Sequence, residues 1–137
     1  MKKFVAVMRR PIFFIVVNFF LVNTLFSLMP NDVGNIVYNI GRIIIMFYAG
    51  WLVAKKKLGG KWQPALAGVT IYFVDHVVIK GGLFLLNYLF KPEGAGLAAF
   101  GGVVASFIMF IPLSMLIGMT GGLVARSRRE KTPVDSQ

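Results

Sequence analysis

Four apolar segments divide this chain, and each is long enough to cross the hydrocarbon core of a lipid bilayer. They cover residues 11–29, 33–54, 65–90 and 97–125. A crossing helix needs about 20 predominantly apolar residues and satisfies its backbone hydrogen bonds internally. Of the 137 residues, 57% are hydrophobic, which is more than a soluble domain of this length can bury. The sequence therefore predicts an all-α membrane protein, a four-transmembrane-helix bundle forming one domain over residues 1–125.

The connections between these four apolar segments, or windows, have the composition of loops. Proline and glycine, which interrupt helices and favour turns, lie in or beside all three connections. The second connection, residues 55–64, is also rich in lysine. Residues 126–137 follow the last window as a short basic tail, which we expect to be disordered.

The positive charge of the chain is concentrated on one side of the predicted membrane domain. Of the 15 Lys and Arg residues, 12 lie at the N-terminus, in the second connection or at the C-terminus, which four crossings place on the same side. They are Lys2, Lys3, Arg9, Arg10, Lys55, Lys56, Lys57, Lys61, Arg126, Arg128, Arg129 and Lys131. Because basic residues near span ends stay cytoplasmic, the sequence predicts a multi-pass protein of the plasma or inner membrane with both termini cytoplasmic.

The residue inventory argues against several functional classes. There is no cysteine, so disulfides, thiolate nucleophiles and cysteine metal sites are impossible, and one histidine with five carboxylates is too few for a zinc cage. We expect no metal and no cofactor. The net charge of +10 is explained by topology and by attraction to anionic lipid headgroups, not by nucleic-acid binding. No catalytic triad or phosphate-binding loop is recognisable, so we do not expect an enzyme.

Charged residues interrupt the apolar windows at one depth. Asp75, His76 and Lys80 lie near the middle of the third window. Charge at the bilayer centre costs at least about 2.5–3.5 kcal/mol per group, so it rarely persists without a partner or water. Counted at about 1.5 Å per residue from the cytoplasmic boundary, Arg42 lies at a depth of about 20 Å and Asp75 at about 17 Å. The sequence therefore predicts an ion pair between Arg42 and Asp75.

Other polar residues extend this layer. Asn23 of the first window and Ser114 of the fourth come out at a similar depth of about 18–21 Å. Asn39 shares a helical face with Arg42. We interpret the set as a wet vestibule that opens outward, and its candidate pathway residues are Asp75, His76, Lys80, Arg42, Asn39 and Asn23. The alternative is structural: the same residues would fix helix register or dock the transmembrane helix of a partner.

Small residues recur at helical spacing in the second and fourth windows. Gly118 and Gly122 are four residues apart, as are Gly50 and Ala54, and Gly102 belongs to a similar row. Such rows let helix backbones approach closely in lipid. We predict helix-packing roles for Gly118, Gly122, Gly102 and Gly50, within one chain or between two copies.

The cytoplasmic ends of the second and fourth windows resemble each other. Residues 49–55 read AGWLVAK and residues 120–126 read TGGLVAR, with four identical positions of seven. This similarity suggests two tandem helical hairpins that arose by duplication, an architecture known in transporters. Convergence is the alternative, because small residues before a basic stop are common at helix ends and the match does not extend into the other windows.

Two functional hypotheses remain. The first is a small transporter or channel for an anion or a proton-coupled solute, assembled as a homo-oligomer, because four helices seldom enclose a pathway alone. The second is a non-catalytic accessory or assembly subunit of a larger membrane complex. Lipid is the expected surrounding in both. Lys80, the cation that remains when Arg42 pairs with Asp75, favours an anion in the first case.

Overall fold

The structure is a computed structural model of the chain, and it describes residues 2–25, 31–58, 60–90 and 97–130. These residues are helical except for the turn that follows residue 55, and they contain no strand. The helices in chain order are α1 (Lys2–Leu25), α2 (Asn31–Lys55), α3 (Gln63–Phe73), η1 (Val74–Gly81), α4 (Gly82–Phe90) and α5 (Leu97–Glu130). η1 is a π-helix that joins α3 to α4 without a break.

Four continuous helices in the described residues are long and apolar enough to cross a membrane. They are Lys2–Leu25, Asp32–Lys55, Gln63–Phe90 and Gly101–Arg128. The third combines α3, η1 and α4. The prediction of an all-helical chain with four helices of membrane-spanning length is therefore confirmed for this part of the chain.

Two helix boundaries differ from the predicted ones. α1 begins at Lys2 rather than at residue 11 and contains Pro11 in its interior. α5 continues to Glu130, so residues 126–130, which we expected to be disordered, are helical. Arginine is a good helix former, and basic side chains near a helix C-terminus interact favourably with the helix dipole. Residues 131–137 of the predicted tail lie outside the described residues.

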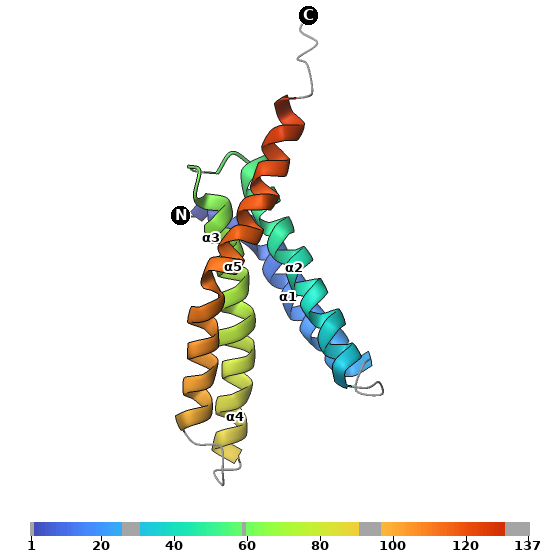
Figure 1. Cartoon of the computed structure of the whole chain (residues 1–137), viewed down its shortest axis with the longest axis vertical. Coiled ribbons are helices and arrows are strands. Elements are labelled where there is room, and N and C mark those ends of the chain that lie inside the picture. The colour runs from blue at the N-terminus through green and yellow to red at the C-terminus, as the bar shows by residue number, and fades with distance from the viewer. Residues whose placement is uncertain (1, 26–30, 59, 91–96, 131–137) are drawn as a thin grey trace, which may run out of the picture.

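The helices form two pairs (Figure 1). α1 lies beside α2, and α5 lies beside α3 and η1 of the third membrane-length helix. The pairs cross at the end that holds the α2–α3 connection, where α5 packs on both α2 and α3. Toward the opposite end the two pairs diverge. The first turn of α1 and the last turns of α5 lie at the crossing end.

The two helix pairs cross at glycines of α2, α3 and α5, which let the backbones approach closely. A Cβ added at Gly50 of α2 would overlap the backbone of Gly118 on α5, and one added at Gly118 would lie 3.1 Å from the Cα of Gly68 on α3. A Cβ on Gly122 would lie 2.6 Å from the Pro64 Cβ. The structure thus places three of the four predicted packing glycines at helix contacts. The buried apolar core consists of Met8, Ile15, Met46, Ala49, Val53, Ala67, Ile71 and Tyr72.

Gly102 differs from the other three glycines. It is exposed, and a Cβ added to it would have no described atom within 4 Å. Gly101, Val104 and Ala105 are exposed as well, so this part of α5 turns its small residues outward instead of toward η1 or α4. Within the described part of one chain, the packing contact predicted for Gly102 is therefore not formed.

The two similar heptapeptides lie against each other at the crossing. Gly50 of the first meets α5 at Gly118, and a Cβ on Gly121 of the second would lie 3.0 Å from the Trp51 backbone nitrogen. Each segment therefore needs a small residue because the other helix passes close to it. This mutual packing accounts for the shared glycine and leaves the duplication a hypothesis.

Candidate functional site

A buried carboxylate on η1 is the centre of the polar cluster. The Asp75 side chain is completely buried, at 0% exposure. One of its oxygens accepts a hydrogen bond from the Tyr38 hydroxyl, and the other lies 3.3 Å from Nη1 of Arg42. Burying a carboxylate is costly unless hydrogen bonds and an opposite charge compensate for lost hydration. The structure supplies both from α2, and it joins Arg42 to Asp75 in the ion pair that their depths predicted.

The helical spacing of α2 explains why two of its side chains reach the same carboxylate. Tyr38 and Arg42 are four residues apart and therefore lie on one face. The neighbouring helix α1 fixes this part of α2, since Nδ2 of Asn18 donates to the Tyr38 carbonyl at 3.3 Å. Gly41 allows the close approach, because a Cβ there would lie 3.0 Å from Cγ of Asn18.

The π-helical spacing of η1 brings a second cation to the cluster. In a π-helix the N–H of residue i+5 donates to the carbonyl of residue i, which widens the turn and brings residues five apart closer to one face than in an α-helix. Asp75 and Lys80 have this separation, and in an α-helix they would point to different sides. Nζ of Lys80 lies 4.9 Å from the centroid of the Tyr38 ring, within the range of a cation–π contact. Tyr38 therefore contacts Asp75 through its hydroxyl and Lys80 through its ring.

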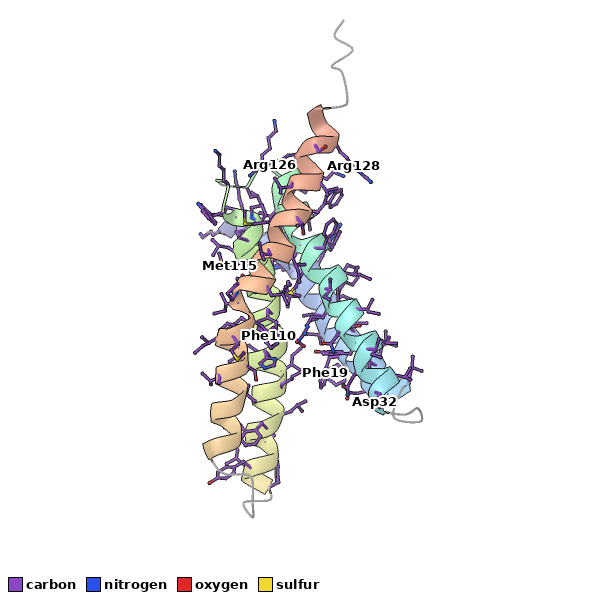
Figure 2. All side chains as sticks on the ribbon, viewed as in Figure 1. Phe19, Asp32, Phe110, Met115, Arg126 and Arg128 are labelled. Carbon is purple, nitrogen blue, oxygen red and sulfur yellow. The ribbon has the colours of Figure 1, made fainter. Side chains whose placement is uncertain are left out.

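Stacked rings close the cluster on the side of α5. The Tyr72 ring stacks on His76 at 5.2 Å and on Phe107 at 5.6 Å between centroids. Phe110, labelled in Figure 2, meets the Tyr72 ring edge-on at 6.4 Å. Cζ of Arg42 lies 5.2 Å from the same ring. The guanidinium is thus held between an aromatic face and a carboxylate, which fixes its orientation.

Two buried nitrogens of the cluster have no hydrogen-bond partner among the described residues. They are Nε of Arg42 and Nδ1 of His76. Buried polar groups in folded proteins are nearly always hydrogen bonded, so each exception needs an explanation such as a ligand or water. Arg42 Nε is always a donor, and the nearby charge is positive in sum because Arg42 and Lys80 face one carboxylate. The arrangement is suited to an acceptor that carries negative charge.

The structure brings four of the six predicted pathway residues together. Arg42, Asp75, His76 and Lys80 lie in one cluster through the contacts just described. Asn23 and Asn39 do not join it: both are exposed, and their amides donate to the Phe19 and Asn35 carbonyls of their own helices, at 2.7 and 2.8 Å. A helix satisfies such an amide locally, so neither the depth of Asn23 nor the helical face of Asn39 brings its side chain into a site. Ser114 is buried but likewise donates to its own helix.

Tyr38 is the site residue that sequence reasoning missed. Tyrosine is common in membrane helices and carries no formal charge, so it does not stand out in an apolar window. The available signal was its position one helical turn before Arg42, on the face that also holds Asn35.

The described residues include no group of three His, Cys, Asp or Glu side chains that could hold a metal ion. The cluster therefore offers two cations, one carboxylate, an imidazole and two tyrosines as its chemical groups. Comparison of the chain with protein-family models, with curated proteins and with solved structures found no match.

Proposed function

We propose that this chain is a four-span protein of the cell membrane that binds a small anion at the Arg42–Asp75–Lys80 cluster and carries it across. One observation supports this most strongly. Within the four apolar windows the formal charges are Arg42, Lys80 and Asp75, so the membrane interior holds one unbalanced positive charge when His76 is neutral. An uncompensated charge in a low-dielectric interior calls for a counter-ion. A mobile anion supplies it.

The geometry of the cluster supports an anion as the ligand. Nε of Arg42 has no acceptor among the described residues, and Nζ of Lys80 lies over the face of the Tyr38 ring. The Asp75 carboxylate would compete with a bound anion for Arg42. Protonation of Asp75 would therefore free the guanidinium to bind the anion. This competition supports proton-coupled transport as one form of the same function.

We also propose the orientation, with both termini and the α2–α3 connection in the cytoplasm. The distribution of Lys and Arg supports it. The chain lacks cysteine, so single cysteines can be introduced without background. A cysteine replacing the exposed Asp32 should react with an impermeant thiol reagent in intact cells, whereas one replacing the exposed Lys61 should react only after lysis. Labelling with the opposite pattern would contradict the orientation.

An accessory subunit remains the second candidate, because the same unbalanced charge would accept a carboxylate from a partner's transmembrane helix. Purification in mild detergent distinguishes the two. A homo-oligomer supports transport, since four helices seldom enclose a pathway. A foreign subunit in fixed ratio supports the accessory role.

Flux measurements test the transport proposal. Purified protein in vesicles should pass at least one anion from a panel of halides, nitrate, phosphate and small carboxylates. Lys80→Gln should lower that flux by about tenfold or more, the value of one charge-assisted hydrogen bond to the ligand. Glutamine keeps a polar group at the position, so the fold should be retained.

Lys61→Gln is the matched control, because it removes one positive charge from an exposed position outside the cluster. Its flux should stay close to that of the unmodified protein. Absence of flux above that of empty vesicles, across the whole panel, would overturn the transport proposal and favour the accessory role.

A further inference from the structure

A pocket of about 180 Å³ lies at the crossing end of the molecule, and its Pro64 is about 16 Å along the third helix from Asp75. It is formed by the end of α2, the α2–α3 connection, the start of α3 and the last turns of α5. Its apolar lining includes Val53, Leu58 and Pro64, and two cations complete it, Lys57 and Arg126. Figure 2 shows Arg126 on the part of α5 near the α2–α3 connection. The pocket thus combines an apolar wall with positive charge from two separate elements.

The end of α2 explains how Lys57 comes to line this pocket. The Leu58 amide donates to the Val53 carbonyl at 3.3 Å, and the Lys57 amide donates to the Ala54 carbonyl at 3.1 Å. These two bonds define a Schellman ending, in which the residue with positive φ is usually glycine. Here it is Lys57, at φ 52. A lysine in a conformation that favours glycine suggests a use for its side chain.

Aromatic side chains indicate the level of the pocket in a membrane. Trp62, beside the pocket in the α2–α3 connection, is 65% exposed. Trp51 stacks on Tyr48, and Nζ of Lys55 lies 4.6 Å from its ring centroid. Tryptophan and tyrosine gather at the headgroup level of membrane proteins, and lysine extends from there toward the aqueous phase. The pocket therefore lies at the depth of the cytoplasmic headgroups in the orientation proposed above.

We propose that this pocket binds the phosphate and glycerol of an anionic phospholipid from the cytoplasmic leaflet. Lys57 and Arg126 provide charge-assisted hydrogen bonds to the phosphate, and the apolar wall contacts the glycerol and the first acyl carbons. Inorganic phosphate shares the first interaction but lacks the second, so the lipid is the better ligand. The lipid site depends on the proposed membrane insertion and orientation, and it is independent of anion transport.

Native mass spectrometry of the full chain in mild detergent tests this site. With added phosphatidylglycerol we expect one lipid to bind first, about tenfold or more tightly than phosphatidylcholine. Inorganic phosphate at millimolar concentration should not displace it. The double variant Lys57→Gln/Arg126→Gln should weaken the first binding event by about tenfold or more, because even one lost charge-assisted hydrogen bond has about that value.

The control is Lys56→Gln/Lys61→Gln, which removes the same charge from exposed positions that do not line the pocket. Its first lipid should bind within about twofold of the unmodified protein, a change of about 0.4 kcal/mol. Equal weakening in both double variants would show a diffuse basic surface and overturn the site. Displacement of the lipid by inorganic phosphate would assign the pocket to free phosphate instead. Both outcomes are measured as lipid binding without an ion gradient, so neither depends on whether the protein transports an anion.

Discussion

Asp75→Ala is expected to remove most of the folded protein recovered in mild detergent. The substitution leaves the Arg42 guanidinium and the Tyr38 hydroxyl without their shared carboxylate. Breaking a buried ion pair by removing one partner costs about 3–5 kcal/mol, a large part of the 5–15 kcal/mol that stabilises a typical domain. The monodisperse fraction in size-exclusion chromatography and the thermal unfolding midpoint would measure the loss.

A double-mutant cycle identifies the cause of that loss. Arg42→Ala alone should be similarly damaging, and Arg42→Ala with Asp75→Ala should recover part of the stability, because fewer buried charges are left unpaired. Simple addition of the two single effects would show that the residues are not partners. Asn39→Ala is the matched control on α2. Its side chain is exposed and its amide donates to the Asn35 carbonyl of the same helix, so its loss should change stability by less than about 0.5 kcal/mol.

The second large effect is expected at the glycine crossing. Gly118→Val should prevent normal packing of α5, because even a Cβ there overlaps the Pro64 carbonyl and lies 3.0 Å from the Gly68 nitrogen. Both neighbours are backbone atoms and cannot rotate away. Overpacking of this kind usually costs about 1–3 kcal/mol and more where backbone must move. The same chromatographic and thermal measurements apply.

Gly102→Val is the control on the same helix. It introduces the same side chain at a glycine where a Cβ meets no described atom within 4 Å. We expect a change of less than about 0.5 kcal/mol. If Gly102→Val and Gly118→Val reduce the folded fraction equally, the effect belongs to valine in α5 and not to the crossing. A selective effect of Gly102→Val on oligomer size would reveal a contact between copies.

Regular geometry made the helices and the ion pair predictable. Apolar length alone identifies four helices, because only a helix satisfies so long an apolar segment internally. The constant rise of about 1.5 Å per residue then places Arg42 and Asp75 at one depth without any knowledge of tertiary contacts. Gly50, Gly118 and Gly122 are recognisable from their spacing for the same reason, since helix faces repeat.

The remaining features depend on departures from that regularity. The i+4 spacing of an α-helix groups His76 with Lys80, whereas the wider turn of the π-helix brings Lys80 nearer to the face of Asp75, and His76 stacks on Tyr72. No residue pattern in this segment signals a π-turn. Asn39 shares a helical face with Arg42, but its amide is satisfied by its own helix. The orientation of Gly102 depends on how α5 turns relative to its neighbours, which spacing does not determine.

The crossing of the helix pairs has a mechanical consequence. The close contact at Gly50 is the pivot about which the two helix pairs would rotate relative to each other. From it, about 27 Å of α2 extends to Asp32. A rotation of about 10° at the pivot moves the far end by about 5 Å over that lever arm. The bonds of Tyr38 and Arg42 to Asp75 lie about 12–18 Å from Gly50 along α2, and they join the α1–α2 pair to the other helix pair. If an anion replaced Asp75 on Arg42 as proposed, the two helix pairs would no longer be joined there, and the angle between them would change with binding.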